Sequence, residues 1–187
     1  QYYRGSGVPQ SYEEAIKYYN MAVKQGDSNG MFFLADMYLI GKGVAKSLKK
    51  AAELFALAAN QGHANAQYQL GHSYEHGEGV AQSFGKAAEL YTLAANQGVA
   101  AAQYNLGSAS IHGRGVAQSI DMARKWWLKA ALQEHEHAIK YLKELDQKEG
   151  KTTPTLPCCA TCGTLKTTRR PLNICSGCRT VHFCNRD

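Results

Sequence analysis

A Gly-x-Gly-Val motif recurs four times along the sequence at a constant interval of 36 residues. No copy contains an insertion or deletion, and the motifs end at Val8, Val44, Val80 and Val116. One serine and two alanines recur downstream of each motif in the same register. These columns are Ser11, Ser47, Ser83 and Ser119; Ala15, Ala51, Ala87 and Ala123; and Ala22, Ala58, Ala94 and Ala130. A fixed period of this length is typical of a repeat protein, in which similar units stack side by side.

Each unit is predicted to contain two helices. In the segment 65–77, Ala66, Leu70 and Tyr74 recur every four residues and would form one stripe on a helix. In the segment 83–98, Ser83 stands at the expected N-cap and Gly98 at the expected C-terminal glycine. The two glycines of the motif predict a tight turn with positive φ, and its valine should fill the gap between the helices.

One helix pair cannot bury both of its faces, so neighbouring units must stack. The predicted fold class is therefore all-α, a right-handed α-solenoid of helix-turn-helix repeats, and a small second domain follows it. The first unit is incomplete, because Tyr2 already occupies the column of Tyr38 inside a first helix. A charged final helix is expected to cap the solenoid, which would span residues 1–147, with a linker at 148–157 and the second domain at 158–187.

The Leu-Gly-x-x-Tyr run, the Gly-x-Gly-Val loop and the Ala-Ala-x-Gln-Gly helix ending resemble Sel1-like repeats, relatives of the tetratricopeptide repeat. The last unit departs from this pattern at Ser110, where other units have tyrosine, and at Glu134, where they have glycine. The resemblance implies a non-enzymatic scaffold or adaptor that binds other proteins along the solenoid. The expected groove is lined by variable positions of the first helices, such as Gln67, Gln69, Gln103 and Asn105.

All six cysteines lie in the basic segment 151–187, which carries six Lys or Arg residues against one Asp. Two Cys-x2-Cys pairs separated by twelve residues are a strong zinc signal, because each pair can present two thiolates to one ion. Clustering in one short segment favours Zn²⁺ in a reducing compartment, either the cytoplasm or the nucleus, over a disulfide framework. The candidate ligands are Cys159, Cys162, Cys175, Cys178 and Cys184, and Cys158 remains an alternative to Cys159.

The run from Cys175 to Cys184, Cys-Ser-Gly-Cys followed by Phe183-Cys184, resembles the core of a MYND-type zinc finger. The resemblance implies two zinc ions with interleaved ligands, some of them beyond Asp187. It also implies binding of short, proline-containing peptides. A second arrangement stays open, in which the two Cys-x2-Cys pairs close on a single zinc by themselves.

Other function classes fit the sequence less well. No stretch approaches the length of about 20 apolar residues that a membrane helix needs. The basic segment has neither a base-reading helix nor a row of stacking aromatics, so proteins rather than nucleic acid are the expected partners. No catalytic motif is present, which favours a non-enzymatic role. Two alternative functions stay open: a regulatory arm of a larger methyltransferase-type enzyme, and a zinc-dependent nucleic-acid-binding protein.

Conspicuous side chains in the repeats have structural interpretations. Trp126 and Trp127 align with Leu90 and Tyr91, so they are predicted to fill the same slots between helices. His135 and His137 form an i, i+2 pair, which on a helix would point to different faces. These two and the other histidines of the repeats are expected at solvated or loop-edge positions: His72, His76 and His112.

Overall fold

The computed structural model describes residue 3 and residues 10–149, 173–174 and 181–182. Within these residues the chain forms eight helices and one pair of short strands. The helices are α1 (Tyr12–Lys24), α2 (Ser28–Ile40), α3 (Leu48–Asn60), α4 (Ala64–His76), α5 (Phe84–Asn96), α6 (Ala100–His112), α7 (Ile120–Ala131) and α8 (Glu136–Lys148). Strands β1 (Asn173–Ile174) and β2 (Val181–His182) pair antiparallel, with Asn173 opposite His182 and Ile174 opposite Val181.

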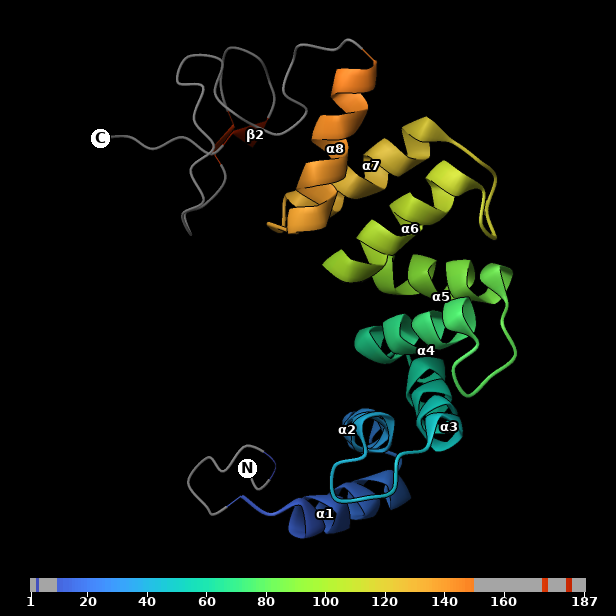
Figure 1. The fold of residues 1–187 in the computed structure, drawn as a ribbon. Helices are drawn as coiled ribbons and strands as arrows, with labels where there is room; N and C mark the ends of the chain where they lie inside the picture. The colour runs from blue at the N-terminus through green and yellow to red at the C-terminus, as the bar shows by residue number, and fades with distance from the viewer. Residues whose placement is uncertain (1–2, 4–9, 150–172, 175–180, 183–187) are drawn as a thin grey trace.

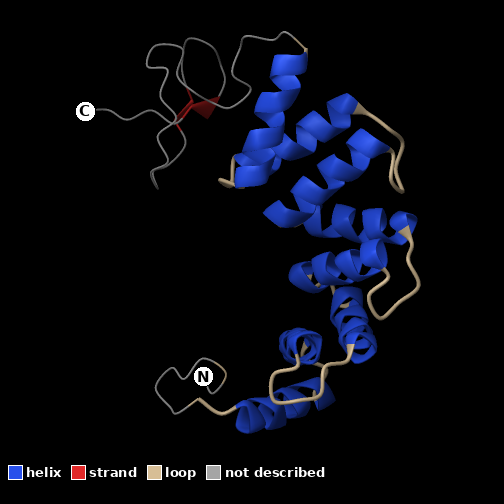
Figure 2. Cartoon of the chain, viewed as in Figure 1, coloured by secondary structure: helices blue, strands red, loops and turns tan. Residues whose placement is uncertain are grey.

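Each helix packs against the helices before and after it in the chain, which makes the helical part an α-solenoid. Figure 1 shows the helices stacked along a curved path that is open on one side, with α2 and α8 on the open side. Short loops join the successive helices (Figure 2). We call α2, α4, α6 and α8 the first helices and α1, α3, α5 and α7 the second helices of the units.

The helix ends follow the predicted capping residues. Each second helix begins after a serine whose side chain accepts a hydrogen bond from the backbone amide three residues later: Ser11, Ser47, Ser83 and Ser119. The three complete first helices that precede a loop end at a glycine in the left-handed conformation: Gly41, Gly77 and Gly113. Local sequence therefore determines where these helices start and stop.

The second glycine of the motif is required by its surroundings as well as by its backbone. Gly79 has a φ of 75°, and a Cβ built there would lie 2.2 Å from the carbonyl oxygen of Leu48. In the same way, a Cβ built at Gly115 would lie 2.0 Å from the carbonyl oxygen of Phe84. The loop of each unit thus presses against the first turn of the second helix in the preceding unit. Val80 packs beside this contact against the buried core, as predicted.

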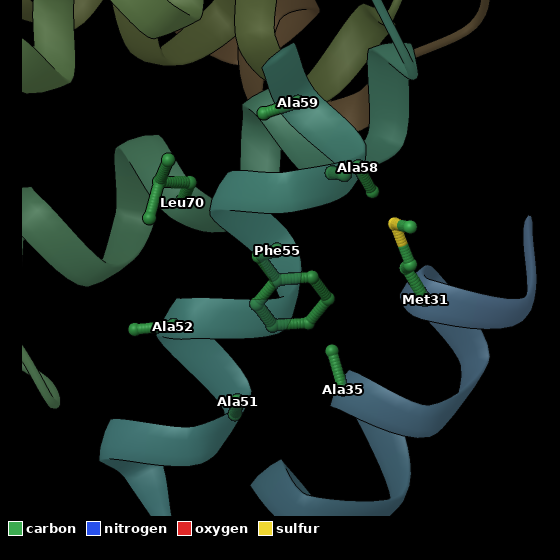
Figure 3. Close-up of a cluster of buried hydrophobic side chains, with 9 residues drawn as sticks. Met31, Ala35, Ala51, Ala52, Phe55, Ala58, Ala59 and Leu70 are labelled. Carbon is green, nitrogen blue, oxygen red and sulfur yellow. The ribbon is translucent and has the colours of Figure 1, made fainter. Parts of the chain in front are cut away.

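The core consists of many alanines together with larger side chains, among them one buried aromatic residue in the same column of α3, α5 and α7. Figure 3 shows the Phe55 ring of α3 facing Met31 and Ala35 of α2. Tyr91 and Trp127 occupy the same column in later units, and both are almost fully buried. Trp126 is buried beside them, so the prediction that the two tryptophans fill slots between helices is confirmed.

The last unit accommodates its two unusual residues locally. Among the described residues, Glu134 is the one non-glycine residue with a positive φ, 62°, where other units have glycine. Ser110 is buried, and its hydroxyl donates to the Leu106 carbonyl over 2.8 Å. The final helix α8 stays in phase, because Ala138 and Leu142 are both fully buried against α7. The predicted helix after the fourth second helix is therefore present.

Candidate functional site

The first helices carry a column of half-buried aromatic rings, Phe32, Tyr68 and Tyr104, at successive units. Each ring lies against the large core residue of the next helix. The ring centroids of Phe32 and Phe55 are 5.7 Å apart, and those of Tyr68 and Tyr91 are 5.9 Å apart. These aromatic side chains form a packed layer, and the more exposed side chains of the first helices lie next to it.

Two columns beside these rings differ in chemistry from unit to unit. We call them together the first-helix face. Its members are Phe33, Gln69, Asn105 and Tyr141 in one column, and Asp36, His72, Ser108 and Glu144 in the other. All eight are exposed or half-buried. The face therefore combines variable side chains with a repeated backbone frame, which is how repeat proteins build binding surfaces.

The prediction that Gln67 and Gln103 line a groove is wrong. Their exposed fractions are only 4% and 5%. Each side-chain amide forms two hydrogen bonds, one through its nitrogen and one through its oxygen. The Gln67 amide nitrogen donates to the Ala59 carbonyl over 3.2 Å, and its oxygen accepts from Gln97 over 2.7 Å. Gln103 repeats this arrangement with Ala95 and Gln133. Both glutamines join neighbouring units, whereas Gln69 and Asn105 lie half-buried on the first-helix face as expected.

A polar network lies at the centre of the face. The Tyr91 hydroxyl donates to a Glu75 carboxylate oxygen over 2.7 Å, and the Asn105 side chain lies beside Tyr68 and Tyr91. Burial raises the pKa of the Tyr91 phenol, and the adjacent Glu75 raises it further. Tyr91 therefore stays a neutral hydrogen-bond donor, which fixes Glu75 in place.

Burial also raises the pKa of Asp36 on the same face, against the lowering effect of Lys42.

Two histidines have a role that the sequence interpretation missed. The Nδ1 atom of His63 accepts from the Ala66 amide over 3.1 Å, and that of His135 accepts from the Ala138 amide over 3.4 Å. Both are N-caps of first helices, and their rings stack on Phe32 and Tyr104 at 4.8 Å. The signal was present in the sequence, because Asp27, a common capping residue, occupies the same column.

The expectation that His135 and His137 diverge on a helix is wrong, because His135 lies before the first turn. Both rings contact Tyr104, and their centroids are 6.1 Å apart. The expectation of solvated or loop-edge positions is confirmed for His76, His112 and His137, which are exposed, and for His135, which is the N-cap at the edge of α8, whereas His72 is half-buried within α4.

The cap at α8 predicts a pH dependence of stability. Burial, followed by the charge of His137, lowers the pKa of His135 below its ordinary value of 6.5. The folded state thus favours the neutral ring, whose Nδ1 accepts the capping bond. Stability from this group is fully present above the unfolded pKa and is lost as the pH falls through 6.5 toward the folded value.

In urea titrations, wild-type protein should lose more stability between about pH 7 and pH 5 than His135→Asn, which keeps a capping side chain without a titrating ring. The exposed His112→Asn serves as control and should keep the wild-type pH dependence. Equal pH dependence in wild type and His135→Asn would contradict this role of His135.

No cluster of three or more metal-binding side chains occurs among the residues that the structure describes. All five predicted zinc ligands, Cys159, Cys162, Cys175, Cys178 and Cys184, lie outside those residues. The described helices include none long and apolar enough to cross a lipid bilayer.

Comparison with known proteins matches the helical part of the chain. The Sel1 repeat model matches residues 2–27, 28–63, 64–99 and 100–135. No curated protein matches. The structure is similar to the protective antigen c5321 of uropathogenic Escherichia coli, with a TM-score of 0.77, 29% identity and coverage of 79% of this chain and 32% of that one.

A Sel1 repeat protein from Oxalobacter formigenes has a TM-score of 0.74 and 30% identity, with coverage of 82% of this chain and 63% of that one. The cysteine-rich protein B of Helicobacter pylori has a TM-score of 0.56 and 25% identity, with coverage of 74% and 99%. The chain thus spans about a third of the first protein and less than two thirds of the second.

Proteins built from Sel1 repeats are generally scaffolds for protein interactions, and family members are typically non-catalytic. The four matched stretches follow one another without a gap; the first contains α1, and the other three coincide with the helix pairs α2–α3, α4–α5 and α6–α7. The chain therefore belongs to the Sel1 repeat family.

Proposed function

We propose that this protein is a non-enzymatic scaffold that binds partner proteins on its first-helix face. The observation that carries the proposal is that buried side chains repeat from unit to unit, whereas side chains on the first-helix face differ in chemistry. Buried columns repeat the same or similar residues, such as Ala66 and Ala102, whereas one column of exposed and half-buried residues presents in turn Phe33, Gln69, Asn105 and Tyr141. Such a surface suits recognition of an extended partner that contacts several units at once.

An affinity experiment tests this function. A variant with Phe33→Arg, Gln69→Glu and His72→Glu changes the face over α2 and α4 without touching a fully buried side chain. We expect it to lose the proteins that wild-type protein retains from a cell extract. The control carries Glu53→Lys, Leu57→Arg and Glu89→Lys on exposed positions of the second helices, and should retain them. Thermal unfolding followed by circular dichroism verifies that both variants fold, and equal retention by the two would exclude the face as the binding surface.

We further propose that the segment 158–187 is a zinc module of the MYND type that binds short, proline-containing peptides. Four thiolates match the preference of structural zinc for tetrahedral sulfur ligands. The antiparallel pairing of Asn173 with His182 and Ile174 with Val181 supports the proposal, because Cys175 and Cys178 lie in the six residues that join the strands. The zinc thiolates would place the protein inside the cell, in the cytoplasm or nucleus.

Zinc content tests the module directly. Elemental analysis of metal-saturated, desalted protein should give about one zinc per chain for residues 1–187 and none for a chain that ends at Pro157. Cys175→Ser should lose the metal, whereas Cys158→Ser should keep it if Cys159 is the ligand. If the chain of residues 1–187 holds no stoichiometric zinc, these cysteines do not close a site in residues 158–187.

A further inference from the structure

A pocket of about 200 Å³ lies between α6, α7 and α8 at the end of the first-helix face. Its apolar lining comes from Ile111, Trp127, Tyr141 and Leu145. Polar side chains from α6 and α8 complete the lining, among them Glu144 and Lys148. A buried cavity of about 150 Å³ can hold a benzene ring, so this pocket is large enough for the end of one protein side chain.

The pocket arises from three differences between the last unit and the one before it. In the preceding unit the equivalent positions hold Tyr91, Glu75 and Asn105, and the Tyr91 hydroxyl donates to a Glu75 carboxylate oxygen. Here Trp127 replaces Tyr91 and Ile111 replaces Glu75.

The third difference is Tyr141, which stands in the column of Asn105. The Trp127 indole N–H donates to the Tyr104 carbonyl over 3.1 Å, so its polar atom is already bonded to the backbone. The polar network of the preceding unit is thereby replaced by an apolar, aromatic surface.

Three features of this surface favour a positive charge. The Trp127 and Tyr141 rings are stacked with centroids 5.4 Å apart, and aromatic faces attract cations. Glu144 lies in the lining, and its ion pair with Lys140 is long, 3.9 Å, with both side chains exposed to solvent. Part of the lining, Ile111 and His112 of α6 and Leu145 and Lys148 of α8, belongs to the last turns of these helices, where the helix dipole presents its negative end.

We propose that this pocket binds an arginine side chain of the partner protein. A planar guanidinium can stack on Tyr141 and pair with the Glu144 carboxylate, which suits arginine better than the compact ammonium of lysine. The inference rests on the proposed scaffold function, since it names the side chain by which a partner would be anchored at one end of the face. Lys148 is the one lysine or arginine among the lining residues, and its charge weakens the site.

The probe is N-acetyl-arginine methylamide, titrated into the full chain and followed by the NMR shift of the Trp127 indole N–H, assigned with Trp126→Phe. We expect saturable binding in the millimolar range, weakened about tenfold for the uncharged citrulline analogue. Glu144→Gln should weaken binding about threefold or more, and Lys148→Met should tighten it about twofold. The matched control Glu136→Gln, in the exposed first turn of α8, should leave binding unchanged.

Equal shifts with the arginine and citrulline probes, or equal affinity in wild type and Glu144→Gln, would overturn the proposal. A lysine analogue that binds as tightly as the arginine probe would overturn the assignment of arginine. Because the probe is a small molecule and the affinity experiment changes only residues on α2 and α4, the two tests fail independently. If partner proteins are retained on the first-helix face but the arginine probe does not bind, this inference is wrong and the proposed scaffold function is unaffected.

Discussion

Replacing Gly79 by alanine should lower the free energy of unfolding by about 3 kcal/mol or more. The residue has a φ of 75°, which costs a residue with a Cβ about 1 kcal/mol. The larger part comes from contact, because the added Cβ would lie 2.2 Å from the Leu48 carbonyl oxygen and 2.4 Å from its carbon. These are backbone atoms at the start of α3, so they cannot turn away as a flexible side chain would. Urea unfolding followed by circular dichroism measures the effect.

Gly62→Ala is the matched control for Gly79→Ala. Gly62 also has a positive φ, 84°, but no atom outside its own neighbourhood lies within 4 Å of the position of its Cβ. Its substitution should cost about 1 kcal/mol, from backbone strain alone. If both substitutions cost the same, the contact between the loop and the preceding unit contributes nothing to stability.

Replacing Asp146 by alanine should destabilise the last helix by about 3 kcal/mol. Asp146 and Glu149 both bind Arg124 of α7, at 2.5 Å and 2.7 Å. The Arg124 and Asp146 side chains are only 15% and 8% exposed, so removal of one partner leaves a mostly buried charge without its nearest counter-ion. We expect faster amide hydrogen exchange in α8 and unchanged exchange in α2 to α5, because units of a solenoid contact only their neighbours.

Two comparisons isolate the ion pair. Glu144→Gln breaks the exposed pair with Lys140 and should cost less than about 1 kcal/mol. Arg124 occupies the column of Ala52 and Ala88, so the double variant Arg124→Ala, Asp146→Ala restores the residue type of the other units at that position. The double variant should lower the free energy of unfolding by less than the sum of the two single substitutions. Strict additivity would show that the two side chains do not stabilise each other.

The helices and their order could be predicted from the sequence because the determinants are local and repeated. Ser83 caps α5 through a bond to an amide three residues away, and Gly77 ends α4 by its own φ. The constant period of 36 residues places every such signal at the same point of each unit, so one interpretation applies to all of them. The capping role of His135 could also have been found locally, by comparison with Asp27.

Side-chain pairing between units was the part that sequence patterns could not supply. Gln67 has the same polar chemistry as Gln69, yet one is buried and the other faces outward. The difference depends on the Ala59 carbonyl of the preceding unit, which Gln67 reaches only when the units stack, and on Gln97, which lies 30 residues further along the chain in the same unit. In the same way, Asp146 finds Arg124 across the α7–α8 interface, although nothing in the spacing of these residues marks them as partners.

By itself, the sequence determined the repeated frame of this protein: its helix boundaries, its glycine turns, its alanine core and the slots for Trp126 and Trp127. The proposed zinc module also rests chiefly on sequence, on the spacing of the cysteines. The tertiary structure alone decided which polar side chains are buried, how α8 is held, and that Trp127, Ile111 and Tyr141 enclose a pocket. The physical reason is range: backbone conformation responds to neighbours within a turn, whereas burial and charge pairing depend on residues that only stacking brings together.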